Sequence, residues 1–348
     1  MSTTTSSSSL NPITVTVRVA TPADYDAVAA LVRSSFAAGP YGHLHASPER
    51  VALESDSAGR AAAGSLLVAE TVDHRIVGTA SLLRSDAAQA RVALEGEVEL
   101  RLVGVDPMIQ GSGIGDALVA ASIVEARGMG ARALVLDTGS LNLRAQRLYL
   151  RHGFERVTER ETLTEDDVVS LVYSFDLEQA EGIRVRLVRS DEISLVADLT
   201  ENAYVSDYPD LPAGYRASLR DVATRAREHE IWIAEDVSTG AILGTVATPR
   251  EGSWISELGR DGELDFRLLA VDPAARGRGI GELLTRHVIA LARSRGLSRV
   301  VMNSGPEMLG AHRLYDRLGF DRLPDRSVTF TDSGQTITLL TFGFDVAP

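Results

Sequence analysis

The hydrophobic and polar positions of this chain predict the same succession of elements twice. In the first half, Glu97 to Val105 is rich in Val and Leu and stops at Asp106-Pro107, which ends a strand and opens a turn. Apolar residues then recur at helical spacing from Gly113 to Arg127, and Ala133 to Asp137 is the short apolar run of a buried strand. A strand, a helix and a strand this close together predict two parallel strands joined by a right-handed crossover.

The second half repeats this pattern. Apolar residues recur at helical spacing from Ile280 to Ser294, and Arg299 to Asn303 follows as the next strand. The runs at 168–177 and 335–346 read as closing antiparallel strands of the two halves. Each half is therefore predicted to be an α/β (α+β) domain with a mixed sheet.

The repetition extends to the residues themselves. The phrase "GVDPMIQGSGIGDAL" begins at Gly104, and "AVDPAARGRGIGELL" begins at Ala270, 166 residues later. Further on, "RAQRLYLRHGF" (144–154) and "GAHRLYDRLGF" (310–320) keep the same offset. Solenoid repeats have periods of about 20–50 residues and usually three or more copies. Two long copies instead indicate two homologous domains of about 165 residues, an ordinary domain size.

The domain boundaries follow from local composition. The Ser/Thr-rich start predicts a disordered tail over residues 1–13. A short polar stretch that ends in glycine predicts a linker over residues 179–182. We therefore expect an N-terminal domain at 14–178 and a C-terminal domain at 183–348.

Composition narrows the classes of function. The chain has 348 residues with 44% hydrophobic and 24% charged residues, which is typical of a soluble globular protein. It contains no lysine, which excludes a Walker-type phosphate loop, and its net charge of −13 argues against sequence-independent nucleic-acid binding. It has no cysteine, so disulfides, thiolate zinc sites and cysteine nucleophiles are impossible. No apolar stretch approaches the roughly 20 residues of a membrane span. We expect a cytoplasmic protein with neither nucleic acid nor membrane as a partner.

Both repeated phrases place a glycine-rich loop between a strand and a helix. Backbone N–H groups and the helix dipole at such a helix start favour an anion, and glycine lets a phosphate approach closely. A dinucleotide-binding G-x-G-x-x-G loop does not fit, because Asp116 and Glu282 stand where its third glycine would be. The six loop residues of each half are Gln110, Gly111, Ser112, Gly113, Ile114 and Gly115, and Arg276, Gly277, Arg278, Gly279, Ile280 and Gly281.

The loop pattern [Gln/Arg]-x-x-Gly-x-Gly after Val-Asp-Pro, with the later Ala-x-x-Leu-Tyr and Gly-Phe, resembles the GNAT superfamily of acetyl-CoA-dependent N-acetyltransferases. The resemblance covers both halves. It implies a mostly antiparallel sheet that splays at one parallel strand pair, with acetyl-CoA between the splayed strands and its pyrophosphate on the loop. Beyond the loop residues, it implies cofactor contacts at Val103, Val105 and Asn142 in the first half, and at Leu269 and Val271 in the second.

The same resemblance implies catalytic roles. The tyrosine of the Ala-x-x-Leu-Tyr segment, Tyr149 or Tyr315, would protonate the leaving thiolate. Glu99 and Asp265, eleven residues before the first loop residue of each half, would act as bases. Backbone N–H groups at a strand bulge, implied at Val105 and Val271, would stabilise the oxyanion. The alternatives left open are a tyrosine that only packs and an acid that only faces solvent.

Acceptor residues are expected in the helical segment after the first strand of each half. The candidates are Phe36 and Tyr41 in the first half, and Tyr204, Asp207 and Tyr208 in the second. Acids among aromatics suit a cationic or aminated ligand, and a solvated lid is the alternative. His43 and His45 lack a third ligand, so no metal site is expected. Met308 stands in the second half where the first has Asn142, so the cofactor contacts of the halves should differ.

These features predict an acetyl-CoA-dependent N-acetyltransferase. It would transfer acetyl to the primary amine of a small molecule by direct attack in a ternary complex, as a monomer or homodimer. Two alternatives stay open. One is a mycothiol-synthase-like acetyltransferase, a subclass that also pairs two such domains. The other is a coenzyme A-binding sensor or scaffold in which one or both halves are non-catalytic. The sequence does not discriminate between a small molecule and a protein as the acetyl acceptor.

Overall fold

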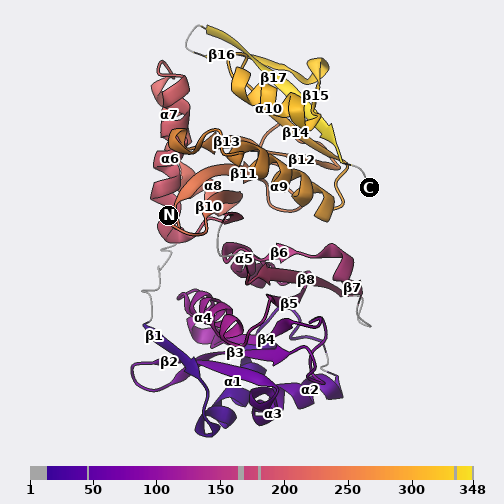
Figure 1. The fold of residues 1–348 in the computed structure, drawn as a ribbon. Helices are drawn as coiled ribbons and strands as arrows, with labels where there is room; N and C mark the ends of the chain where they lie inside the picture. Colours follow the sequence, from indigo (N-terminus) through magenta and orange to yellow (C-terminus); the bar gives the residue numbers. More distant parts are fainter. Residues whose placement is uncertain (1–13, 45–46, 164–167, 179–181, 333–334, 347–348) are drawn as a thin grey trace, which may run out of the picture. The chain divides into compact units, whose positions relative to one another are not determined.

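The computed structural model describes residues 14–44, 47–163, 168–178, 182–332 and 335–346. The chain divides into two compact units, Met1–Gln179 and Ala180–Pro348, which we call the first and the second unit (Figure 1). Each unit contains one copy of the repeated phrase. The tail expected at 1–13 and residues 179–181 of the expected linker lie outside the described residues.

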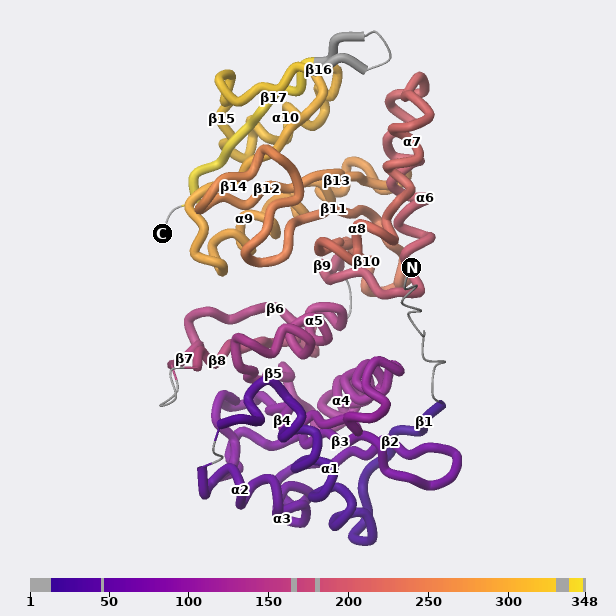
Figure 2. Tube along the Cα trace, turned by 180° about the vertical axis from the view of Figure 1, so that it is seen from behind, coloured from indigo at the N-terminus to yellow at the C-terminus, as the bar shows by residue number. Residues whose placement is uncertain are grey.

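The first unit is built on one mixed sheet with the strand order β1-β2-β3-β4-β5-β8-β6, and β7 pairs with β8. Helices α1 to α3 cover one face of this sheet and α4 covers the other (Figures 1 and 2). The strands are β1 (Val15–Val19), β2 (Gly64–Thr71), β3 (Ile76–Arg84), β4 (Glu97–Val105), β5 (Ala133–Gly139), β6 (Glu155–Arg156), β7 (Thr162–Leu163) and β8 (Val169–Asp176). The helices are α1 (Tyr25–Ala37), α2 (Pro48–Ser55), α3 (Ser57–Ala62), α4 (Ile114–Gly128) and α5 (Leu143–Arg151).

The second unit repeats this order of elements, with its sheet divided into the paths β13-β11-β10-β9 and β12-β14-β17-β15, and β16 paired with β17. The strands are β9 (Ile183–Leu187), β10 (Glu230–Asp236), β11 (Ile242–Thr248), β12 (Glu263–Asp265), β13 (Arg267–Val271), β14 (Arg299–Ser304), β15 (Asp321–Arg322), β16 (Val328–Asp332) and β17 (Gln335–Asp345). The helices are α6 (Ile193–Asp207), α7 (Ala213–Arg220), α8 (Val222–Glu228), α9 (Ile280–Ser294) and α10 (Leu309–Leu318). The predicted fold class, two α/β domains with mixed sheets, is confirmed.

The predicted parallel strand pair is present in each unit, and it is short. Strand β4 is nine residues long, but only Glu97–Glu99 pair with β5. In the second unit β12 pairs with β14 over Glu263–Asp265, and β13 continues without a parallel partner. Each parallel pair therefore separates just after its first three residues.

A bulge in the backbone coincides with this separation. Leu102 has φ of 51° and Leu268 has φ of 54°, a left-handed conformation that is rare for any residue but glycine. The register between β3 and β4 shifts at the same place, between Thr79 and Ser81. A bulge of this kind bends its strand and strengthens the local twist, which turns β4 away from β5.

The bulge also changes which side chains of β4 face which helix. Val98 and Leu100 belong to the hydrophobic core that includes α4, whereas Leu102 belongs to the cluster that includes α1. Beyond the bulge, Val103 and Val105 pack against the α4 core again. One extra residue in a strand exchanges its two faces, so the glycine loop after β4 starts on the α4 side.

The core of the second unit holds a histidine in a nonpolar setting. His287 of α9 lies against Trp232 of β10, with ring centroids 4.2 Å apart. Its Nε2 is enclosed and has no hydrogen-bond partner among the described residues. Burial, together with the charge of Arg295, lowers the pKa of His287 from its usual value of 6.5 to about 4.

This histidine makes the stability of the second unit depend on pH. Because the folded-state pKa is depressed, the stabilisation is present above pH 6.5 and is lost as the pH falls toward 4, where only the unfolded chain takes up the proton. We expect a loss of roughly 1–2 kcal/mol between pH 7 and pH 5. Urea unfolding followed by tryptophan fluorescence measures this unit alone, because both tryptophans, Trp232 and Trp254, lie in it. In His287→Leu the free energy of unfolding should depend less steeply on pH between pH 7 and pH 5. An unchanged dependence would assign it to other groups.

Candidate functional site

The glycine loop of each unit forms an open helix start. Gly113 and Gly279 are the residues that cap α4 and α9, with φ of 86° and 78°. A Cβ atom added to either would meet no atom within 4 Å, although its backbone conformation would be strained. The space beside each capping glycine is therefore open, as the close approach of a phosphate to a helix N-terminus requires.

The two repeated motifs of each unit contact each other. A Cβ atom added to Gly115 would lie 3.2 Å from Leu148 Cδ2, and one added to Gly281 would lie 3.3 Å from Leu314 Cδ2. The leucine of Ala-x-x-Leu-Tyr thus packs on the first turn of the helix that follows the glycine loop. This contact explains why the motifs keep one spacing in both units, and it fixes the neighbouring tyrosine relative to the loop.

Polar side chains tie down the two loops differently. Gln110 Oε1 accepts a hydrogen bond of 2.6 Å from Arg144, and the Ser112 hydroxyl donates to the Ile109 carbonyl at 2.7 Å. Arg276 forms an ion pair of 2.7 Å with Asp207 at the end of α6, and Arg278 forms one of 3.0 Å with Asp236. The two loop arginines of the second unit are therefore held by carboxylates in this structure.

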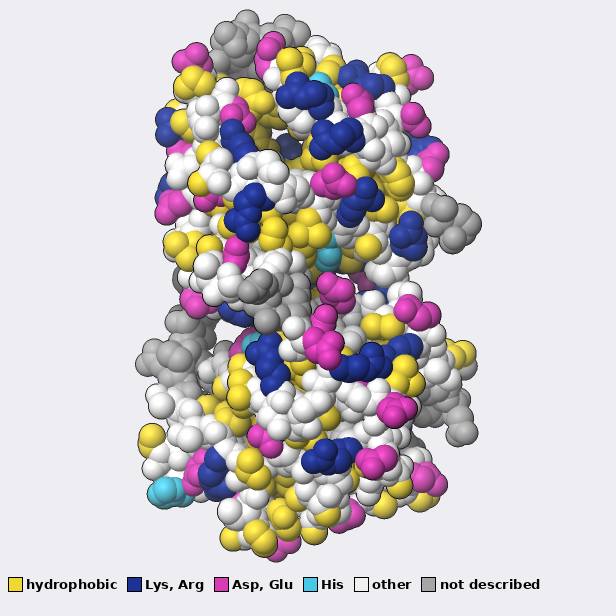
Figure 3. Space-filling view, in the orientation of Figure 1, with side chains coloured by type: hydrophobic (Ala, Val, Ile, Leu, Met, Phe, Trp, Pro, Cys, Tyr) yellow, Lys and Arg dark blue, Asp and Glu magenta, His cyan; other side chains and the backbone are white. Residues whose placement is uncertain are grey.

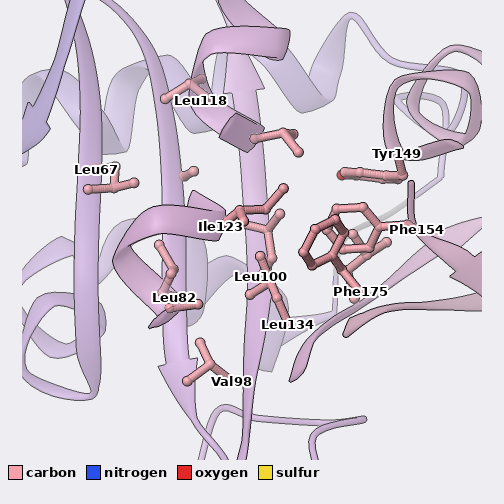
Figure 4. Packing of buried hydrophobic residues seen from close by; sticks show 14 of the residues in the cluster. Leu67, Leu82, Val98, Leu100, Leu118, Ile123, Leu134, Tyr149, Phe154 and Phe175 are labelled. Carbon is pink, nitrogen blue, oxygen red and sulfur yellow. The ribbon is translucent and has the colours of Figure 1, made fainter. Parts of the chain in front are cut away.

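Tyr149 and Tyr315 occupy matching places in rings of aromatic side chains. Their exposed fractions are 6% and 2%. The Tyr149 ring lies 5.6 Å from Phe154, and Figure 4 shows it extending from α5 beside Phe154. The Tyr315 ring lies 5.5 Å from Phe342. Both rings pack, as the alternative for these tyrosines proposed.

The tyrosine hydroxyls are nevertheless free to act. No described residue forms a hydrogen bond with the hydroxyl of Tyr149 or Tyr315. Neither hydroxyl oxygen is fully enclosed by the protein. Burial raises the pKa of both tyrosines far above 10, and the charge of Asp137 adds to the rise at Tyr149. Each hydroxyl therefore stays protonated at neutral pH and can donate a proton.

Glu99 and Asp265 are fully buried and anchor the loop that precedes their strand. Glu99 Oε2 accepts hydrogen bonds from the backbone N–H groups of residues 91, 92 and 93, and its Oε1 makes no hydrogen bond with a described residue. Asp265 accepts from the Ile255 N–H at 3.1 Å and from the Ser256 hydroxyl at 2.7 Å. Neither acid faces solvent, and only Glu99 keeps an oxygen without a hydrogen bond, which lies 3.4 Å from Arg101 Nε.

The strand bulge lies three residues before the place that the sequence implied. It is centred on Leu102 and Leu268, not on Val105 and Val271. The N–H of Val105 already donates to the Ser35 hydroxyl of α1 at 3.2 Å. The sequence implied a different position because no local sequence pattern predicts a left-handed backbone conformation at a leucine.

The family of the chain follows from comparison with known proteins. The family model described as "Acetyltransferase (GNAT) family" matches residues 29–154 and 194–320, one match in each unit. The chain belongs to the GNAT acetyltransferases. It is therefore an acyltransferase that uses acetyl-CoA, and the open glycine loops are the part of each unit suited to hold the cofactor's phosphates.

Individual relatives extend this result. Glucosamine 6-phosphate N-acetyltransferase 1 of Oryza sativa subsp. japonica is 33% identical over 144 residues, 41% of this chain and 78% of the relative. A mycothiol acetyltransferase of Stackebrandtia nassauensis is 32% identical over 229 residues, 63% of this chain and 69% of the relative. Among solved structures, a GNAT-family acetyltransferase of Desulfovibrio desulfuricans aligns with a TM-score of 0.38 at 22% identity, covering 47% of this chain and 99% of its own.

The other residues that the sequence implies as cofactor contacts lie at helix starts and just after the bulges. Asn142 begins α5, where its Oδ1 accepts a hydrogen bond of 3.3 Å from the Ala145 N–H. Met308 begins α10 without a side-chain hydrogen bond. Val103 and Leu269, one residue after each bulge, are half-buried beside the splayed strands. The first unit thus keeps a polar cap where the second has an apolar one.

In the first unit, the expected acceptor residues Phe36 and Tyr41 contact an arginine of α2 and the end of β5, respectively. The Arg50 guanidinium lies over the Phe36 ring, 5.2 Å from its centroid. The Tyr41 hydroxyl accepts a hydrogen bond of 2.6 Å from the Leu141 N–H, and its ring occupies the space beside Gly139. Tyr41 therefore closes the end of β5.

The expected acceptor residues of the second unit are an aromatic pair and a held acid. Tyr204 of α6 and Tyr215 of α7 meet edge to face with centroids 6.3 Å apart. Asp207 is taken by Arg276, as described above. Burial raises the pKa of Tyr208, which follows α6.

No sequence motif marks Arg101 and Arg267. They stand two residues after the buried acids, at the shared 166-residue offset.

Membrane-spanning helices and metal sites are the two remaining features to consider in the described residues. Within the described part of the chain, no helix is long and apolar enough to cross a membrane. Over the same residues, no group of three or more His, Cys, Asp or Glu side chains is arranged to hold a metal ion.

The loop geometry predicts how each unit loses its cofactor. Gly279→Asp adds a negative charge where the phosphates would approach, so it should abolish binding in the second unit, and Gly113→Asp should do the same in the first. The matched controls are Gly279→Asn and Gly113→Asn, since Asn tolerates the left-handed conformation without the charge. Calorimetric titration with coenzyme A should give two sites per wild-type chain and one in each Asp variant. A single wild-type site lost in only one Asp variant would show that the other unit does not bind.

Proposed function

We propose that each unit binds acetyl-CoA and that the acetyl group passes directly to the primary amine of a small molecule within a ternary complex. The observation that supports this most is shared by both units: a buried, protonated tyrosine, whose hydroxyl forms no hydrogen bond with a described residue, follows the leucine that packs against the glycine-loop helix. A scaffold that only bound coenzyme A would have no use for this hydroxyl.

In the first unit the proposed steps use residues already described. Acetyl-CoA supplies the thioester. The amides at the start of α4 hold the diphosphate. Glu99 Oε1, the oxygen left unoccupied by the loop amides, accepts the proton of the attacking amine. The Tyr149 hydroxyl donates its proton to the departing thiolate, which restores a neutral thiol.

The second unit differs in the proposed proton acceptor. Both oxygens of Asp265 are engaged by the loop that it anchors. We propose that an amine enters this unit after losing its proton to solvent, and that Tyr315 alone transfers a proton from the protein. The first unit should then accept amines at a lower pH than the second.

A second candidate is a mycothiol-type acetyltransferase. The match to the mycothiol acetyltransferase of Stackebrandtia nassauensis spans 229 residues of the alignment, more than either unit contains, so it draws on both units. The acceptor screen should therefore include the amine precursor of mycothiol beside amino acids, amino sugars and peptide N-termini. Thiol release from acetyl-CoA is a clean readout, since the chain has no cysteine of its own.

The tyrosines test the proposal. Tyr149→Phe and Tyr315→Phe keep the buried ring and remove the hydroxyl, which forms no hydrogen bond with a described residue, so stability should change by less than about 1.5 kcal/mol. Turnover by the affected unit should fall by roughly 10²–10⁴-fold, the usual contribution of a positioned acid. Coenzyme A affinity should be unchanged, because the loop provides it.

The pair of variants also assigns the work of each unit. A loss only in Tyr149→Phe would place catalysis in the first unit, and a loss only in Tyr315→Phe would place it in the second. Full turnover in the double variant, on an acceptor shown to be acetylated by the wild type, would exclude the acid role. A fall in melting temperature that tracks the loss of activity would show that the tyrosines act through packing.

A further inference from the structure

The acidic residues of the second unit's acceptor helices are neutralised within the protein. Glu201 of α6 forms ion pairs of 2.8 Å with Arg216 and 2.6 Å with Arg220 of α7. Asp207 pairs with Arg276 of the glycine loop at 2.7 Å. These carboxylates are thus paired with arginines of the protein in this structure.

Arg267 is in the opposite situation. It is exposed, and none of the described residues forms a hydrogen bond or an ion pair with it. It stands one residue before the bulge at Leu268, and its cross-strand partner is Ala247 of β11. Ala247 is buried in the cluster formed with α6 and α8. Because directly paired residues of adjacent strands point to the same face, Arg267 lies on the face that these helices cover.

A second arginine without an acidic partner lies nearby. Arg225 of α8 donates hydrogen bonds of 2.9 Å to the backbone carbonyls of Ser218 and Leu219 and forms no ion pair with a described residue. Burial raises the pKa of Tyr215, and the charges of Arg267 and Arg225 both oppose that rise. Both guanidinium groups therefore act electrostatically on the Tyr215 hydroxyl.

Tyrosines connect these arginines to the proposed catalytic group. The Tyr204 hydroxyl is within electrostatic reach of Tyr215, Tyr315 and Arg267. Residues from α6, α7, α10 and β13 thus converge. The space-filling view shows a hollow in this part of the second unit, between α7 and α10 and beside β13, bordered by arginine side chains (Figure 3).

The first unit differs at the position that corresponds to Arg267. Arg101, the counterpart of Arg267, lies 3.4 Å from Glu99 Oε1. Arg91 lies 3.6 Å from Asp137, and Arg50 pairs with Glu54 at 2.8 Å. These three arginines have a carboxylate partner, whereas Arg60 of α3 donates to the Ser81 hydroxyl at 2.7 Å and forms no ion pair with a described residue.

We propose that the second unit acetylates amines that also carry an anionic group, a carboxylate or a phosphate, which Arg267 binds with the support of Arg225. This rests on the proposed function, since it names the acceptor class of a unit taken to be catalytic. A guanidinium fork matches both anions in geometry and charge. The tyrosine hydroxyls around it can donate further hydrogen bonds to either anion.

Matched pairs of acceptors test the inference on the full chain. Glucosamine 6-phosphate is compared with glucosamine, and an amino acid with its primary amide, so that each pair keeps the amine and removes only the anion. We expect a preference of about 10- to 100-fold in kcat/KM for the anionic member of one pair, the value of one charged hydrogen-bonded contact. The pair that shows it identifies phosphate or carboxylate as the source.

Variants assign the preference to Arg267. In Arg267→Gln the preference should disappear through a higher KM with little change in kcat, whereas Arg267→Lys should keep part of it. Arg293→Gln, which changes an exposed arginine of α9, is the matched control and should behave like the wild type. Tryptophan fluorescence confirms that the second unit remains folded in each variant.

The outcomes separate this inference from the proposed function. Acetylation without any preference for the anionic member, or a preference that survives in Arg267→Gln, would overturn the inference and leave the acetyltransferase activity intact. If no amine is acetylated, the acceptor part of the proposed function fails. Calorimetry with the four compounds in the presence of coenzyme A then decides. Binding of an anionic member by the wild type but not by Arg267→Gln supports the inference, and equal binding by both contradicts it.

Discussion

The separation of one parallel strand pair is the constraint on which each unit depends. A left-handed leucine costs roughly 1–2 kcal/mol relative to ordinary strand geometry, yet both units hold one at the same place. The bulge ends the pairing after three residues, returns the strand to the α4 or α9 side, and so aims the chain into the glycine loop. Without it, β4 would pair along its full length with β5 and leave no opening for a ligand between them.

The two units share this frame and differ in the polar contacts placed on it. Phe36 lies under an arginine of α2, whereas Tyr204 meets a tyrosine of α7. The first residue of the loop is bonded to α5 in the first unit and to α6 in the second. The packing contacts recur, such as the leucine against the first turn of the loop helix, and so do structural ion pairs such as those of Glu97 with Arg160 and of Glu263 with Arg326. The polar contacts of the glycine loops and of the expected acceptor residues do not recur. This division is what two copies of one domain with separate acceptors would require.

Much of this architecture could be predicted because its signals are local. The residue type of Gly113 and Gly279 alone predicts a loop and a helix start, and the repeat predicts two domains. The position of the bulge could not be predicted, since Leu102 and Leu268 look like ordinary strand residues. The setting of Glu99 was equally hidden, because the amides that it binds come from a loop whose path depends on tertiary packing. Asp207 looked available in the sequence because its partner lies 69 residues away.

The ion pairs described in both units use arginine wherever the cation is not histidine, as they must in a chain without lysine. This has a chemical consequence for a protein that concentrates a reactive thioester. A guanidinium stays protonated at any physiological pH and is a poor nucleophile, whereas a lysine amine would be an acetyl acceptor. No side chain of this protein therefore offers a primary amine to compete with the substrate. Repeated turnover leaves its salt bridges chemically unmodified.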